Sequence, residues 1–328
     1  MNDEYIITFD RVKIKSNHKY LLKTKIRFNE MFHSRSGERI GLFYSSKDDI
    51  NIPYNLFIAV NYPKQTLTLE FSSKILKEYY PYLISKATIK ECLININQLD
   101  ICKINIDGIL SDGAITSVDV TRDTDLLLSD NILNSLNSQV NNYRRFKWTH
   151  YDKEGITFTK DVKPKDCVET ITLYNKEKEI NTNCNKKFLN SLSQQIKNYF
   201  KGKTRFEVTL STPKKIKSYL ELADNKIFNV LNSNANPILT QFDRIFGKPY
   251  STSDFQQPIF DNYEDWSMKI LIDRYEGDLK RLEQDIRSKF ASRSGASKRM
   301  KKIEVVYRVM TTVSPSENPI EKVRNLLL

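Results

Sequence analysis

Three short segments of the chain place ionisable residues near the ends of predicted strands. In the first, residues 117–123, Asp119 and Asp123 alternate with other residues so that both carboxylates fall on one strand face. Two carboxylates on one face could converge on a single divalent cation, and hard oxygen ligands favour Mg²⁺ or Mn²⁺. The alternative interpretation is a solvated strand edge followed by an Asp helix cap.

The second segment ends an apolar strand at Tyr174 and continues into the charged residues Lys176 and Glu179. A phenol has an unperturbed pKa of about 10, so a nucleophilic tyrosine needs help at neutral pH and belongs beside cations at an exposed strand or helix end. Lys176, two residues on, is expected to share the strand face of Tyr174. The alternative is a tyrosine that is merely amphipathic.

The third segment is the predicted strand of residues 205–210. Alternation places Arg205 and Glu207 on one face, with Phe206 and Val208 on the other. Taken alone, this pattern is also typical of a same-face ion pair on a solvated strand.

The elements that position these residues read as strands interleaved with helices. Runs of β-branched and aromatic residues bounded by turn residues predict strands, and apolar residues at helical spacing predict helices. The predicted strands cover residues 5–9, 40–44, 56–60, 67–71, 115–120, 146–150 with 156–159 as a hairpin, 168–174 and 205–210. The predicted helices begin at Ser72 and cover residues 88–99, 126–140 and 186–200. This order predicts an α+β fold with helices packed on an antiparallel sheet.

A domain boundary is predicted where the last strand ends. The run Ser211, Thr212 and Pro213 is both a strand stop and a helix start, and the signals beyond it are mostly helical. The sequence therefore predicts an α+β domain over residues 1–212 and a helical domain over residues 213–328.

The composition indicates an ordinary folded protein with a polyanionic partner. The formal charge is +12, and a positive field attracts polyanions such as nucleic acid. The four cysteines form no C-x-x-C pair, which favours buried structural thiols over a zinc site. Without a signal-peptide pattern or a run of about 18 apolar residues, a cytoplasmic protein without a membrane partner is expected.

Together the three segments resemble a known family. Tyr174, Asn175 and Lys176, with Glu179 five residues after the tyrosine, resemble the motif of plasmid rolling-circle replication initiators of the Rep_trans type, and filamentous-phage gene II replication proteins share much of the pattern. The likeness includes the acids of residues 117–123, Arg205 and Glu207, and a strand carrying Glu70. It spans about residues 67 to 210.

The resemblance implies an HUH-like nickase domain over residues 1–212. Tyr174 would be the nucleophile that cuts and rejoins DNA, and Lys176 would stabilise the phosphate or the phenolate. Asp123, then Asp119 and Glu70, would ligate Mg²⁺ or Mn²⁺. The supporting residues would be Glu179, Arg205 and Glu207. Better-known nickases of this type bind metal through a paired His motif, which the three histidines of this chain do not form.

Two basic stretches are predicted to hold DNA. Residues 186–217 carry nine Lys or Arg against one Glu with interleaved aromatics, and residues 280–308 carry ten against three acids around a flexible run at 292–299. The predicted DNA-binding residues are Lys201, Lys203, Lys298, Arg299, Lys301 and Lys302. A solvated helix and loop is the alternative for the second stretch.

The implied partner is single-stranded or hairpin origin DNA of a plasmid or phage. A host helicase, a polymerase and a second copy of the chain are further candidates, and the helical domain would make DNA or replisome contacts. Two other functions fit the same residues: a relaxase or transposase with the same tyrosine chemistry, and a non-catalytic nucleic-acid-binding protein in which Tyr174 only stacks on a base.

Overall fold

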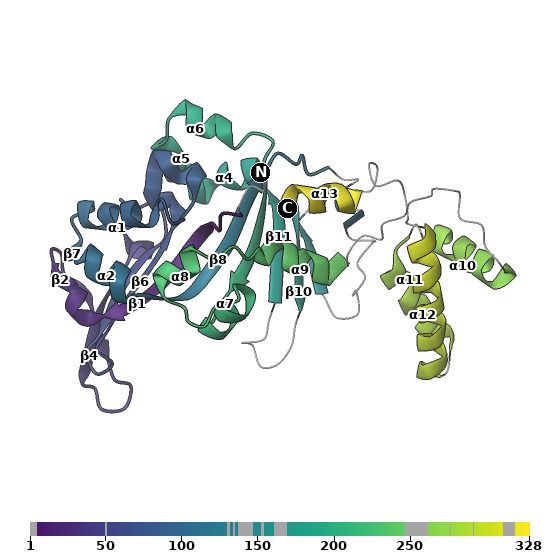
Figure 1. The fold of residues 1–328 in the computed structure, drawn as a ribbon, viewed down its shortest axis with the longest axis horizontal. Helices are drawn as coiled ribbons and strands as arrows, with labels where there is room; N and C mark the ends of the chain where they lie inside the picture. The colour runs from purple at the N-terminus through teal and green to yellow at the C-terminus, as the bar shows by residue number, and fades with distance from the viewer. Residues whose placement is uncertain are drawn as a thin grey trace.

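The structure is a computed structural model that describes residues 5–49, 51–129, 132–133, 135–136, 147–151, 154–160, 169–246, 262–275, 277–290, 292–310 and 319–328. Its main element is a large antiparallel sheet (Figure 1). The strands of this sheet are β1 (Phe9–Asn17), β3 (Asn29–Phe32), β4 (Arg39–Ser45), β5 (Leu56–Asn61), β6 (Thr66–Ser72), β8 (Ala114–Thr124), β9 (Lys147–Tyr151), β10 (Gly155–Lys160), β11 (Glu169–Asn175) and β12 (Thr204–Leu210). Within the described residues they lie in the order β3-β4-β5-β6-β1-β8-β12-β11-β10-β9. Strands β2 (Leu21–Thr24) and β7 (Cys102–Ile104) pair separately.

The predicted α+β class and antiparallel sheet are confirmed, but the first strand is misplaced in the prediction. Strand β1 begins at Phe9, where the predicted strand ends. Its residues Val12 and Ile14 are buried and alternate with Lys13 and Lys15, which is the alternation of a half-buried strand that the prediction did not use. A register shift between Phe9 and Arg11 breaks the alternation at Asp10. Of the helix predicted over residues 126–140, residues 126–129 are not helical, residues 132–133 and 135–136 are helical, and the others lie outside the described residues.

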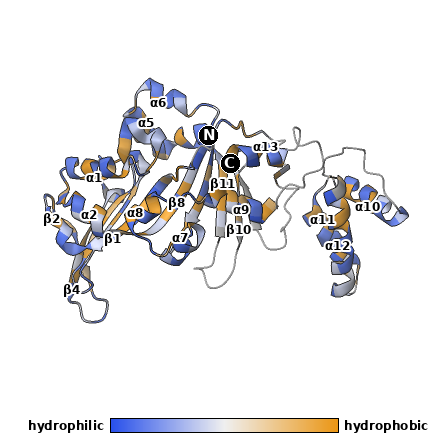
Figure 2. Ribbon diagram, viewed as in Figure 1, coloured by the Kyte–Doolittle hydropathy of each residue, from blue (hydrophilic) through white to orange (hydrophobic). Residues whose placement is uncertain are grey.

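One face of the sheet is apolar and is covered by helices. Phe206 and Val208 of β12 are buried on this face. Helices α7 (Pro213–Tyr219) and α9 (Pro237–Phe246) pack on β12, and α8 (Ile227–Leu231) packs on β8. Phe246 of α9 packs edge to face on Phe158 of β10, with ring centroids 5.3 Å apart. Figure 2 shows hydrophobic residues on α8 and α9 where they lie over the sheet.

The predicted domain boundary at residue 212 divides elements that pack together. Helices α7 to α9 follow this boundary but complete the core of the sheet domain. Helix α13 (Pro319–Leu327) packs on the same domain. Its Arg324 forms a bidentate ion pair with Asp243 of α9 at 2.8 and 3.0 Å. Burial of the apolar sheet face is the physical reason, because a sheet face needs a covering layer.

Three helices beyond α9 pack on one another. They are α10 (Tyr263–Arg274), α11 (Leu279–Lys289) and α12 (Arg293–Met310), and Figure 1 shows them away from the sheet. The run at residues 292–299, predicted as flexible, mostly forms the first turns of α12. Among the helices of the described residues, none has the length and apolar composition needed to cross a bilayer.

The opposite face of the sheet carries polar side chains and is covered near the start of β12. The covering elements are the 3₁₀ helix η3 (Ser73–Tyr82), α4 (Lys176–Ile180), η5 (Asn183–Asn185), α5 (Lys186–Asn190) and α6 (Gln194–Tyr199). Tyr80 of η3 is fully buried there against Phe188 and Phe200. The remaining named elements are η1 (His18–Tyr20), η2 (Ser46–Asp48), α1 (Ile89–Gln98) and α2 (Ile106–Asp112). The helix predicted over residues 186–200 is two short helices, α5 and α6.

Candidate active site

One row of cross-strand neighbours brings several predicted residues together on the polar face. Tyr174 of β11 lies opposite Arg205 of β12, which lies opposite Asp123 of β8. Directly opposed residues point to the same side of a sheet. Beyond Tyr174 the row continues through Gly155 to Tyr151. A Cβ atom on Gly155 would clash with the Leu173 carbonyl oxygen and lie 2.8 Å from the Cβ of Tyr174, so glycine permits the close approach of β10 to β11 here.

Tyr174 and Glu207 form the contact with the clearest chemical meaning. The Tyr174 hydroxyl donates a hydrogen bond of 2.8 Å to Oε1 of Glu207. Burial, and then the charge of Asp10, raise the pKa of Glu207 to about 7. Burial and the Glu207 carboxylate also raise the pKa of Tyr174 well above its ordinary value. The phenol is therefore protonated at neutral pH, beside a carboxylate that is poised to take its proton.

Arg205 is fully buried and is held by two carboxylates and a phenol. Its guanidinium donates to both oxygens of Asp123 at 2.6 and 2.8 Å, to Asp10 at 2.9 Å and to the Tyr80 hydroxyl at 3.0 Å. Burial alone would raise the pKa of Asp10, but the charges of Arg205 and Lys176 outweigh it and hold this pKa at about 2. Arg205 is thus a fixed positive charge two residues before Glu207.

Lys176 does not continue the strand as predicted. Strand β11 ends at Asn175, whose side chain caps α4, and Lys176 is the first residue of that helix. The Lys176 side chain is 1% exposed and its Nζ lies 2.5 Å from Glu179. The same ammonium lies 5.6 Å from the Tyr174 ring centre and 5.4 Å from that of Tyr80. A cation at this distance favours the ionised form of the tyrosine.

Glu179 is held by a small polar network. Asn185 donates to its Oε1 at 2.8 Å, and Lys74 of η3 donates to Asn185 at 2.7 Å. Burial opposes ionisation of Glu179, but Lys176 and Lys74 outweigh it and lower its pKa. The network fixes α4 and η3 around Lys176, and the supporting role that the resemblance implies for Glu179 stays a prediction.

The three residues predicted as metal ligands do not come together. Asp123 is engaged by Arg205, whereas Asp119 and Glu70 both bind Arg11, at 2.7 and 2.9 Å. Asp119 and Asp123 are four residues apart on one strand, about 13 Å at the rise of a β-strand, which is too far to share an ion. In the part of the chain that the structure describes, no group of three or more His, Cys, Asp or Glu residues suits a metal ion. The predicted set of Asp123, Asp119 and Glu70 therefore does not fit a single cation.

The predicted DNA-binding residues lie in two places. Near the site, Lys201 is exposed, and Lys203 pairs with Asp125 at 2.6 Å with its Nζ 4.7 Å from the Tyr199 ring centre. The other four predicted residues, Lys298, Arg299, Lys301 and Lys302, are exposed on α12. Of these, Lys302 pairs with Glu264 of α10 at 2.9 Å.

Replacing Asp123 by alanine should lower the free energy of unfolding by about 3 kcal/mol, because it removes the bidentate carboxylate partner of the buried Arg205 guanidinium. Urea unfolding monitored by circular dichroism measures this change. Asp125→Ala is the matched control, since Asp125 is 89% exposed and its ion pair with Lys203 contributes at most about 1 kcal/mol. Equal stabilities of the two variants would contradict the structural role of the Asp123–Arg205 pair.

Several residues of the site carry no recognisable motif. Asp10, Ser73 and Tyr80 come from the first 80 residues, and Ser73 donates to Asp10 at 2.5 Å. The only local signal is that Asp10 interrupts an apolar strand pattern, while Tyr80 resembles a core residue of a helix. Asp10 and Tyr80 meet Arg205 only because the fold brings them there: β1 lies across β8 from β12, and η3 covers the start of β12.

The completed arrangement joins a phenol, a carboxylate of raised pKa and two buried cations. In such a combination the carboxylate can take the phenolic proton during attack, while the cations stabilise the negative charge that develops. Comparison of the chain with models of known protein families and with curated proteins gives no match.

Proposed function

We propose that this protein is a tyrosine nickase that cuts and rejoins single-stranded DNA, acting as a rolling-circle replication initiator. The hydrogen bond between Tyr174 and Glu207 carries this proposal. The hydroxyl of Tyr174 donates to a carboxylate whose pKa burial and Asp10 raise to about 7, so this carboxylate can accept the phenolic proton. Perturbed ionisable groups beside a nucleophile are typical of active sites.

The chemical step uses Tyr174 as nucleophile and Glu207 as general base. The Tyr174 proton moves to Glu207 Oε1 as the phenolic oxygen attacks the phosphorus of a phosphodiester. The bond between phosphorus and the 3′-oxygen breaks, and the 3′-oxygen takes a proton from solvent to become a free hydroxyl. The products are a 5′-phosphotyrosine and a 3′-end that can prime synthesis. The reverse sequence rejoins the strand, and no nucleotide is consumed.

The buried cations support this step from a distance. Lys176 lies against the Tyr174 ring and stabilises the phenolate that forms during attack. The Arg205 guanidinium forms ion pairs with Asp10 and Asp123 and holds both carboxylates beside Glu207. Arg205 therefore serves as a positioning residue. Tyr80 is fully buried and its hydroxyl accepts from Arg205, so it is not placed as a second nucleophile.

Dependence on Mg²⁺ or Mn²⁺ stays a prediction. Asp123, Asp119 and Glu70 are engaged by arginines, and no step above passes through a metal ion. Comparing cleavage in Mn²⁺ with cleavage in a chelator tests the requirement separately from the identity of the nucleophile.

The proposed function is tested by incubating the protein with single-stranded DNA from its own replicon and Mn²⁺. We expect a covalent protein–DNA product that forms without ATP. DNA binding without any covalent product would instead support a non-catalytic nucleic-acid-binding protein. A relaxase or transposase gives the same adduct, and an origin of replication beside the gene favours the initiator.

We place this activity in the cytoplasm.

The α12 cations should make binding sensitive to salt. Single-strand affinity falls with salt by about 0.7 logarithmic units per phosphate contact. Reversing the charge of Lys298, Arg299, Lys301 and Lys302 should therefore reduce the slope of log K against log salt by up to about 3. Fluorescence anisotropy at several salt concentrations measures this slope. Reversal at the exposed Lys47 and Lys64 is the control, and equal slopes in the two variants would indicate that α12 is only a solvated helix.

A further inference from the structure

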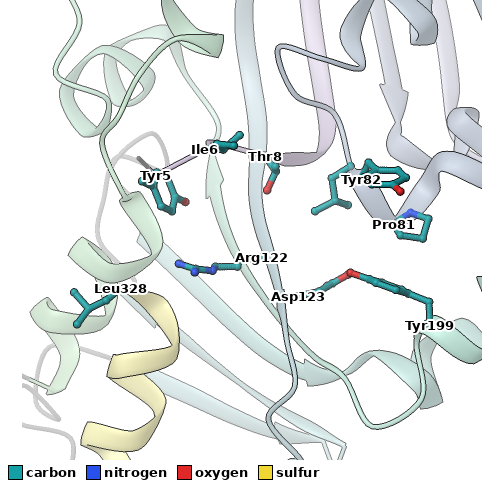
Figure 3. Close-up of a pocket in the computed structure, with 10 residues that line it drawn as sticks. Tyr5, Ile6, Thr8, Pro81, Tyr82, Arg122, Asp123, Tyr199 and Leu328 are labelled. Carbon is teal, nitrogen blue, oxygen red and sulfur yellow. The ribbon is translucent and has the colours of Figure 1, made fainter. Parts of the chain in front are cut away.

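Strand β8 extends beyond its neighbour on one side and leaves a cavity there. Its register with β1 ends at Phe9 opposite Val120, after which the Thr121 N–H still reaches the Thr8 carbonyl at 2.9 Å. On its other side β8 remains paired with β12 up to Thr124. The cavity beside this free edge has a volume of about 340 Å³ and is lined in part by Arg122 and Asp123 of β8 (Figure 3). This volume is at the lower end of the range for small-molecule pockets, about 300–1,000 Å³.

Three of the ten residues that line the cavity are tyrosines. Tyr5, Tyr82 and Tyr199 come from three separate segments, and Figure 3 shows them around Arg122 and Asp123. The Tyr82 side chain is 66% exposed, and its neighbour Tyr79 is 61% exposed with ring centroids 6.2 Å apart. Exposed aromatic rings at the mouth of a cavity provide faces on which a planar ligand can stack.

The polar groups of the cavity favour a ligand with hydrogen-bond acceptors. Arg122 lies against the Tyr5 ring at 5.9 Å and donates from Nη1 to the Leu327 carbonyl at 2.8 Å. A guanidinium has five N–H donors, so others remain for a ligand. Lys203 does not line the cavity, but its ammonium lies 4.7 Å from the ring centre of Tyr199, which does. Cations interleaved with stacking rings are the composition that binds single-stranded nucleic acid.

The cavity also lies close to the proposed nucleophile. Asp123 in its wall is two strands away from Tyr174 in the same cross-strand row, which corresponds to about 10 Å at the spacing of strands in a sheet. We propose that this cavity binds one unpaired base of the single-stranded substrate, stacked on Tyr82 and Tyr199, while a nearby phosphate of the same strand reaches Tyr174. The position of that phosphate rests on the proposed function, whereas the stacking of the base does not.

Photocrosslinking locates the base directly. The probe is a 15-residue oligothymidylate with a single 5-iododeoxyuridine, irradiated with the full-length Tyr174→Phe protein so that no cleavage intervenes. We expect mass spectrometry to find the crosslink on Tyr82 or Tyr199. Crosslinks confined to α12 would overturn the proposal.

Affinity measurements test the same pocket independently. Tyr82→Ala should weaken binding of the oligothymidylate about tenfold in fluorescence anisotropy, because it removes one stacking partner. The exposure of Tyr82 implies that the variant remains folded, which its melting temperature checks. Tyr62→Ala is the matched control, since Tyr62 is 43% exposed and lies at the turn between β5 and β6, at the opposite end of β6 from η3. Wild-type affinity in Tyr82→Ala would also overturn the proposal.

The two proposals fail in different ways. A crosslink in the cavity together with no covalent adduct in the wild-type protein would support the base pocket and contradict the nickase. An adduct at Tyr174 with normal binding and cleavage by Tyr82→Ala would support the nickase and contradict the base pocket.

Discussion

Tyr174→Phe should form no covalent product with single-stranded DNA while keeping its fold and its DNA affinity. The substitution removes the attacking oxygen and leaves the ring, so packing against Lys176 is retained. Loss of the hydrogen bond to Glu207 should change stability by about 1 kcal/mol. With a 3′-labelled oligonucleotide, the wild-type protein should carry the label through denaturing electrophoresis. The other fragment should be extendable by a polymerase, because it ends in a free 3′-hydroxyl.

Two other tyrosines serve as comparisons for this variant. Tyr151 belongs to the same cross-strand row, two strands from Tyr174, and Tyr151→Phe should form the adduct at the wild-type rate. Tyr143 lies outside the described residues and is compared in the same way. Peptide mapping of the adduct identifies the attached residue. An adduct formed by Tyr174→Phe at the normal rate would show that Tyr174 is structural.

Glu207→Gln should slow formation of the adduct about 100-fold or more, the contribution typical of a general base. Glutamine retains a carbonyl oxygen that can accept from the Tyr174 hydroxyl but cannot take its proton. In the wild-type protein the rate should rise with pH through about 7, because the carboxylate is the active form and its pKa is about 7. The variant should lack this rise. Single-turnover rates between pH 5 and pH 9 measure both effects.

The same substitution should make the protein more stable above neutral pH. Because the folded state raises the pKa of Glu207 above its unfolded value, Glu207 favours the folded state fully only below the unfolded pKa of about 4.3. That contribution is lost as pH rises through about 7. The free energy of unfolding of Glu207→Gln should therefore exceed that of the wild type by up to roughly 4 kcal/mol at pH 8 and by little at pH 4.

A control separates this effect from any Glu-to-Gln change. Glu38 is exposed in the turn between β3 and β4, and Glu38→Gln should alter neither the rate nor the pH dependence of stability. If the variant is slow at every pH yet no more stable at pH 8, Glu207 supports the geometry of the site rather than accepting the proton.

The local pattern of the sequence was sufficient to predict which residues share a face. Alternation along residues 205–210 places Arg205 and Glu207 on the polar side of β12, and the apolar run before Tyr174 places that tyrosine at the end of β11. These predictions agree with the structure because the side-chain period of a strand is a local property. The break after Asn175 was missed because Asn175 caps a helix that is only five residues long.

The tertiary structure decided which of these side chains meet. Strand order and register place Asp123 opposite Arg205, so a predicted metal ligand becomes the partner of a buried guanidinium. Asp10 reaches the same guanidinium across 195 positions of sequence, and no periodic pattern encodes such a contact. Depth of burial likewise sets the pKa of Glu207, because desolvation depends on everything packed around a group. The sequence by itself therefore determined the residue types and their faces, while the fold determined their partners and their protonation.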